Sequence, residues 1–145
     1  MTPLDLRDHP PRAPRATLLG YYLLPRTIDK LRAELPGGNM GAYLNRASGF
    51  SAFVVKRIGL DMDEFRAAVA AAGDETSVAA WLAARIDPAG APALNAKLES
   101  FVVERMSLAD QELVRQRHRV LAERPELSKI LDILDADDQH AFATR

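Results

Sequence analysis

Basic and aromatic side chains gather between residues 7 and 32 of the sequence, within a chain whose remainder is acidic. A guanidinium group binds a carboxylate or a phosphate through a planar fork of hydrogen bonds, and a helix N-terminus adds positive potential. This segment is therefore the candidate site for a small anionic molecule or an acidic protein segment. The ligand-binding candidates are Arg7, Arg12, Arg15, Tyr21, Arg26, Asp29 and Lys30.

Their spacing places three of these residues on one face of a predicted helix. If Pro25 occupies the first helical position, Arg26, Asp29 and Lys30 lie at i, i+3 and i+4 and share a face. The arginines of the preceding proline-rich arm can fold back beside that face. The alternative is structural: Asp29 pairs with Arg26 or with an arm arginine, and this ion pair only pins the arm to the helix.

The same segment leaves room for other classes of function. A small metal-independent enzyme would use Asp29 or His9 as a general base beside Tyr21, provided that the base reaches its proton within hydrogen-bond distance. A histidine between an aspartate and prolines is more often exposed than catalytic. A structural homo-oligomer subunit is the third class. The function is therefore unknown at this stage, with a binding or interaction module as the leading hypothesis.

No other motif predicts a metal or a cofactor. The histidines at positions 9, 118 and 140 are scattered, and residues 137–140 lack the convergent ligands of a zinc or iron site. Residues 37–41 are rich in glycine but lack the Lys-Ser/Thr of a phosphate loop, so they predict a turn with positive φ angles. The basic run at residues 115–119 fans around a helix axis, so nucleic-acid binding is not expected.

Composition predicts an ordinary globular protein. The chain has 145 residues, 48% of them hydrophobic and 27% charged, with no cysteine and a net charge of −1. No apolar segment approaches the roughly 20 residues that span a bilayer, and the prolines near the N-terminus argue against an export signal. We therefore expect a soluble, cytoplasmic protein without membrane contact. Residues 1–60 carry nine Lys/Arg against four Asp/Glu. This excess of positive charge indicates either a surface that faces anions or basic residues that pair with the acidic residues of the second half of the chain.

Apolar stripes at helical spacing dominate the chain. They predict a mainly α fold: a single-domain bundle of six to eight short helices over residues 25–145, preceded by an extended arm and an apolar segment at residues 1–24. Asp61 and Glu64 form a capping box by composition, either Asp74 or Thr76 is suited to begin the next helix, and Ser107 is suited to begin a later one. Pro125 is expected to end one helix and to open the last one.

The N-terminal third resembles the opening of a bacterial domain-of-unknown-function family, number 5069. The matching elements are Asp5-Leu6-Arg7, Pro11-Arg12-Ala13-Pro14-Arg15, Leu19-Gly20-Tyr21 and Leu24-Pro25-Arg26-Thr27-Ile28-Asp29-Lys30-Leu31-Arg32-Ala33. Residues 38–43 resemble the glycine-containing element that follows in the family, although Met40 and Ala42 depart from its pattern. Because no activity is assigned to the family, the resemblance implies a shared fold and a compartment rather than a reaction.

Overall fold

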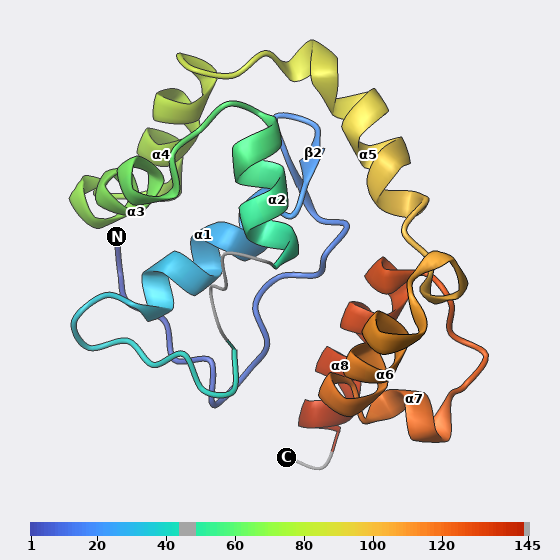
Figure 1. Cartoon of the computed structure of the whole chain (residues 1–145). Helices are drawn as coiled ribbons and strands as arrows, with labels where there is room; N and C mark the ends of the chain where they lie inside the picture. The colour runs from blue at the N-terminus through green and yellow to red at the C-terminus, as the bar shows by residue number, and fades with distance from the viewer. Residues whose placement is uncertain (44–48, 144–145) are drawn as a thin grey trace. The chain divides into compact units, whose positions relative to one another are not determined.

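The structure, a computed structural model, describes residues 1–43 and 49–143 and is mainly α-helical (Figure 1). Within these residues it contains eight short α-helices, which confirms the predicted fold class. None of these helices is long and apolar enough to cross a membrane. In chain order the elements are β1 (Thr17–Leu18), β2 (Tyr21–Tyr22), α1 (Leu24–Ala33), α2 (Phe50–Arg57), α3 (Met62–Ala71), α4 (Glu75–Ala83), α5 (Ala91–Glu99), α6 (Leu108–Arg117), α7 (Val120–Glu123) and α8 (Ile130–Phe142), with short 3₁₀ helices η1 (Pro88–Gly90) and η2 (Val103–Arg105).

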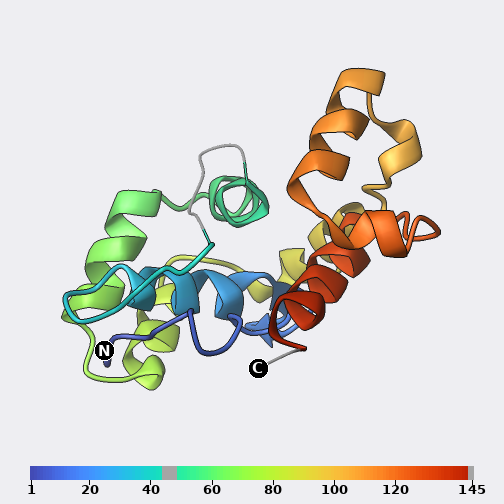
Figure 2. The same ribbon diagram turned by 90° about the horizontal axis from the view of Figure 1, so that it is seen from below.

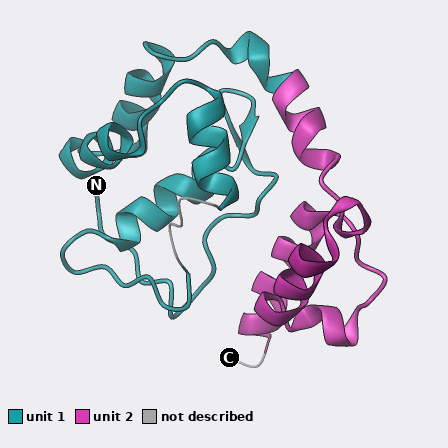
Figure 3. Cartoon of the chain, viewed as in Figure 1, with its two compact units in different colours: residues 1–92 teal, residues 93–145 magenta. Residues whose placement is uncertain are grey.

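The chain folds as two compact units, Met1–Pro92 and Ala93–Arg145 (Figure 3). Unit 1 contains the arm, the two strands and the helices α1 to α4. Unit 2 contains most of α5 and all the elements that follow. The predicted single domain stays a prediction, and the candidate site lies wholly within unit 1.

A tight hairpin connects the arm to the first helix. Strands β1 and β2 pair antiparallel, and the two residues between them, Leu19 and Gly20, have φ angles of 52° and 83°. Positive φ at both central positions is the geometry that suits the right-handed twist of a two-residue hairpin. Leu23, at φ 70°, then turns the chain into α1, where Pro25 stands in the first turn as expected. The apolar segment at residues 18–24 is thus a strand, a turn and a second strand, with Tyr21, Leu23 and Leu24 buried in the core. Leu24 already belongs to α1, so the helical part begins one residue before the predicted boundary at residue 25.

Helix α1 packs against α2 and α3 at the centre of unit 1 (Figures 1 and 2). The apolar side chains of α1 recur at helical spacing and form a stripe along the helix. Burial of this stripe against the apolar side chains of α2 and α3 stabilises unit 1. The buried side chains include Leu24, Ile28 and Leu31 from α1, Val54 and Val55 from α2, Phe65 and Val69 from α3, and Val78 and Leu82 from α4.

The N-terminal arm is fixed along α1 and the loop that follows it. The amide of Leu4 donates to the carbonyl of Arg32 at 3.3 Å, and the amide of Leu6 donates to the carbonyl of Asn39 at 2.8 Å. The side chain of Leu6 is buried. The loop bends at Gly37 and Gly41, with φ angles of 89° and 56°, which confirms the predicted turn. A Cβ at Gly41 would lie 2.8 Å from the carbonyl oxygen of Leu6, so glycine lets the loop approach the arm.

The predicted helix starts in the middle of the chain are largely confirmed. Asp61 accepts from the amides of Asp63 and Glu64, Asp74 accepts from the amide of Ser77, and Ser107 accepts from the amide of Asp110. Only half of the expected capping box forms, because the Glu64 side chain makes no hydrogen bond to Asp61 within the described residues.

The prediction that Pro125 opens the last helix is wrong, because α8 begins only at Ile130. A helix does end just before Pro125, but it is the short α7, which ends at Glu123, since α6 already ends at Arg117. Pro125 itself lies in a turn, and the chain is extended at Lys129, which bridges to Val102, while the amide of Ile130 donates to the carbonyl of Phe101 at 3.0 Å. These tertiary hydrogen bonds outweigh the local preference of Pro125 for the first turn of a helix.

Candidate functional site

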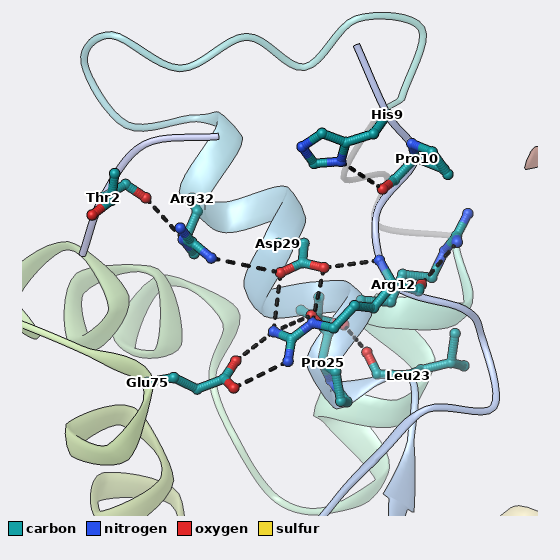
Figure 4. Close-up of polar contacts among 11 residues, drawn as sticks. Thr2, His9, Pro10, Arg12, Leu23, Pro25, Asp29, Arg32 and Glu75 are labelled. Atoms are coloured by element: carbon teal, nitrogen blue, oxygen red, sulfur yellow. Dashed lines mark hydrogen bonds and ion pairs between the residues drawn. The ribbon is translucent and has the colours of Figure 1, made fainter. Parts of the chain in front are cut away.

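An open pocket of about 320 Å³ lies in unit 1, between the arm, α1 and the start of α4 (Figure 4). A volume of this size is in the range of small-ligand sites. Its walls carry two arginines, two carboxylates and a histidine beside two apolar residues. The lining residues are Leu4, His9, Pro10, Arg12, Asp29, Arg32 and Glu75.

Asp29 is buried at the base of this pocket and is bound by Arg12. Its side chain is only 6% exposed. The Nε of Arg12 donates to Oδ2 at 3.0 Å, Nη2 donates to Oδ1 at 3.0 Å, and the amide of Arg12 donates to Oδ2 at 2.8 Å. A buried carboxylate keeps its charge when hydrogen bonds and an opposite charge replace its hydration. The arm arginine therefore supplies what Asp29 needs, which is the structural pairing that the sequence allowed.

Glu75 binds the adjacent edge of the same guanidinium, which shares Nη2 with the edge that Asp29 binds. Nη1 of Arg12 donates to Oε2 at 3.0 Å, and Nη2 donates to Oε1. The hydrogen bond from Arg12 lowers the pKa of Glu75 below its ordinary value. The hydrogen bond to Glu75 likewise raises the pKa of Arg12, against the opposite effect of its burial. Both side chains are 39% exposed, so this pair is open to solvent.

Arg32 is the second guanidinium of the pocket. Its Nε donates to the carbonyl of Thr2 at 2.8 Å, and its Nη1 lies 4.0 Å from Oδ1 of Asp29. Within the described residues, its terminal nitrogens donate no hydrogen bond, although the side chain is only 19% exposed. A guanidinium group has five N–H donors. Arg32 therefore presents charged donors to the pocket that an acidic ligand can use.

His9 stands at the rim on the arm (Figure 4). Its Nδ1 lies 3.0 Å from the carbonyl oxygen of Pro10, so this nitrogen carries a proton when it donates there. The other ring nitrogen, Nε2, has no hydrogen-bond partner within the described residues. His9 is exposed, and its ring nitrogen adds a polar contact at the mouth of the pocket.

The structure brings together only part of the predicted set. Arg12 and Asp29 line the pocket. Arg26 is buried beneath the arm, where its Nη1 donates to the carbonyl of Arg12 at 3.2 Å and its guanidinium lies 5.6 Å from the centre of the Tyr43 ring. The arm thus folds back beside the predicted face of α1. Lys30, on the same face, is half-buried and does not line the pocket.

The remaining predicted residues lie outside the lining. Arg7 is exposed and pairs with Asp5 within the arm, and its hydrogen bond lowers the pKa of Asp5 to about 2. Arg15 is half-buried and also has a partner. The buried Tyr21 donates its hydroxyl hydrogen to the carbonyl of Asp87 at 2.5 Å, and burial raises its pKa. Tyr21 therefore joins the hairpin to the start of η1 and does not line the pocket.

Sequence reasoning missed Arg32 and Glu75. The helical-spacing argument applied to Arg26, Asp29 and Lys30 could also have identified Arg32. Arg32 lies three positions after Asp29 on α1, and residues with this spacing are neighbours on a helix surface. Glu75 carries no comparable signal. It reaches the arm only because α4 lies against the start of the chain, a relationship that local spacing does not contain.

The described residues contain no group of three or more potential metal ligands among His, Cys, Asp and Glu. The acidic segment near the C-terminus is engaged in another way. Asp137 lies 3.0 Å from Nδ1 of His118, and His140 lies 3.4 Å from Glu123. These histidine–carboxylate pairs join neighbouring segments of unit 2.

The comparison with protein families places almost all of the chain in one family. No curated protein matches the chain significantly. The model of the family described as a domain of unknown function (DUF5069) matches residues 8–140, which include the pocket residues from His9 to Glu75. The chain therefore belongs to the DUF5069 family.

Proposed function

We propose that this protein is a small binding module whose unit 1 pocket takes an anionic small molecule, either a carboxylate or a phosphate. The proposal is supported above all by Arg32, a guanidinium group that lines the pocket and whose terminal nitrogens donate no hydrogen bond within the described residues, although Nη1 forms a 4.0 Å ion pair with Asp29. Charge-assisted hydrogen bonds of this kind are about twice as strong as neutral ones. His9 offers a further ring nitrogen at the mouth.

The two carboxylates of the pocket shape this proposal. Asp29 and Glu75 balance the charges of Arg12 and Arg32, so the pocket has little net field to attract anions from a distance. Recognition then depends on directed hydrogen bonds at short range. Because Asp29 lies 4.0 Å from Nη1 of Arg32, it also orients that guanidinium towards the pocket.

Binding is a better match to this geometry than acid–base catalysis. Both oxygens of Asp29 accept hydrogen bonds from Arg12, so this carboxylate is already engaged with the arm. Tyr21, the proposed companion of such a base, donates its hydroxyl hydrogen to Asp87 instead. The pocket therefore lacks the pair on which the enzyme hypothesis depends.

Isothermal titration with butyrate, succinate and inorganic phosphate, at constant ionic strength, tests the proposal. We expect saturable binding of at least one anion by the native chain, and weakening by about tenfold or more in Arg32→Gln, because a hydrogen bond to a charged group is lost. Arg57→Gln is the matched control, since Arg57 is an exposed arginine in the last turn of α2. A glutamate-rich peptide in the same titration tests an acidic protein segment as the occupant. Absence of saturable binding, or equal affinity in Arg32→Gln, contradicts the proposal.

We also propose the cytoplasm of a bacterium as the compartment. The chain has no cysteine, so it needs no oxidising environment for its fold. Fractionation of cells that express the full-length protein, followed by immunoblotting, measures this directly.

A further inference from the structure

The outer edge of the Arg12 guanidinium is occupied by a carboxylate of the chain itself. Asp29 holds the inner edge and Glu75 holds the outer edge, each through two guanidinium nitrogens (Figure 4). Paired forks of this type are also how arginine recognises a carboxylate or a phosphate of a ligand. The carboxylate of Glu75 thus has the chemistry and the position of a bound anionic group.

The two edges of Arg12 differ in how firmly they are held. The side chain of Asp29 is 6% exposed and also accepts a hydrogen bond from the amide of Arg12, so it anchors the arm itself. The side chain of Glu75 is 39% exposed, and it projects from the first turn of another helix. Exposed ion pairs contribute little to stability because water and salt compete with them. An acidic ligand can therefore replace Glu75 without releasing the arm from α1.

The second guanidinium of the pocket lies close to the first. Nη2 of Arg12 lies 3.0 Å from Oδ1 of Asp29, and Nη1 of Arg32 lies 4.0 Å from the same oxygen. Both cations therefore flank one carboxylate oxygen and line one pocket of about 320 Å³. A small molecule with two acidic groups can reach both.

We infer that Glu75 is an internal competitor for a second anion subsite at Arg12, and that the pocket takes a small dicarboxylate, which displaces Glu75. The inference rests on the proposed function, because Arg32 receives the first acidic group of the ligand. The second group takes the edge of Arg12 that Glu75 leaves. A monocarboxylate needs only Arg32, so Glu75 does not compete with it.

Titrations with succinate and butyrate test this inference on the native chain, Glu75→Gln and Glu75→Ala. We expect both variants to bind succinate about two- to fivefold more tightly, the range that the loss of a competing exposed ion pair implies. Butyrate affinity is expected to rise much less than succinate affinity, because butyrate gains only from the loss of one negative charge and not from the vacated edge of Arg12. Glu64→Gln is the matched control, because Glu64 is an exposed glutamate in the first turn of α3 and lies outside the pocket. It removes the same charge and should change neither affinity.

The outcomes separate this inference from the proposed function. The competitor role of Glu75 is overturned if succinate binds both Glu75 variants no more tightly than the native chain. It is also overturned if butyrate affinity rises as much as succinate affinity. In either case, binding that depends on Arg32 still stands. No binding of either acid by any variant overturns both. Circular dichroism verifies that each variant is folded, and the second substitution at position 75 decides the matter if one of them is not.

Discussion

Arg12 and Asp29 lie 17 residues apart and are joined side chain to side chain by two hydrogen bonds of 3.0 Å. The amide of Arg12 adds a third at 2.8 Å, so backbone and side chain of the arm converge on one buried carboxylate. This relationship makes Arg12 part of the support of the pocket rather than an unoccupied binding group. It also makes Asp29 a structural anion, and it leaves Arg32 as the group with donors to offer.

Arg12→Ala is expected to destabilise the chain. Asp29 would keep its buried position without the charged donors that replace water, and an unsatisfied buried polar group costs about 1–3 kcal/mol. Urea unfolding followed by circular dichroism measures the change. Arg7→Ala is the control, because Arg7 is an exposed arm arginine whose partner lies two residues away, and it should shift the unfolding midpoint far less. Equal shifts in the two variants would show that Arg12 does not anchor the arm.

The contribution of Glu75 to stability is expected to vanish in acid. The hydrogen bond from Arg12 lowers the folded-state pKa of Glu75 below its ordinary value of 4.5. A lowered folded-state pKa means that the stabilisation is present above pH 4.5 and is lost as the pH falls through the folded-state value. Thermal unfolding of the native chain and of Glu75→Gln across this range measures it. A difference between the two melting temperatures that persists well below pH 4.5 would refute the assignment.

Gly20→Ala is expected to cost about 1–2 kcal/mol, because a side chain at positive φ brings Cβ too close to the backbone. The φ angle of Gly20 is 83°, and an added Cβ would also lie 3.1 Å from the Cβ of Ala91. Gly73→Ala is the matched control, since no atom lies within 4 Å of an added Cβ there and its φ is not in the left-handed region. Chemical denaturation should show a loss only for Gly20→Ala. A comparable loss in both variants would argue against the hairpin geometry.

Ser107→Ala is expected to destabilise unit 2 by about 1 kcal/mol, the usual contribution of an N-cap side chain. The hydroxyl oxygen of Ser107 accepts from the amide of Asp110 at 3.1 Å, at the start of α6. Ser107→Asp should retain most of the stability, because a carboxylate also caps a helix well. Hydrogen exchange of the α6 amides localises the effect. Unaltered exchange in Ser107→Ala would mean that the cap contributes nothing.

Local signals predicted the elements well. Asp61, Asp74 and Ser107 each accept from amides of their own first turn, and Pro25 stands in the first turn of α1, so these roles can be inferred from a few neighbouring residues. The structural alternative paired Asp29 with Arg26 or with an arm arginine, and the structure has it paired with Arg12.

Contacts between distant segments were beyond such reasoning. Glu75 meets Arg12 across 63 positions of the chain, and no spacing rule identifies this pair. The extended segment before α8 depends on the bridge between Val102 and Lys129, which overrides what Pro125 favours locally. In both cases the hydrogen bonds that determine the structure join residues far apart in the sequence, beyond the few neighbouring positions that helical spacing compares.

The order in which Arg12 receives its partners has a consequence for synthesis. A ribosome releases the chain N-terminus first, and the two acidic partners of Arg12 follow 17 and 63 residues later. The edge of the guanidinium that Glu75 occupies therefore stays open to the surrounding salt and metabolites until the start of α4 has emerged. The arm is held on both edges of Arg12 only once the chain has been made as far as Glu75.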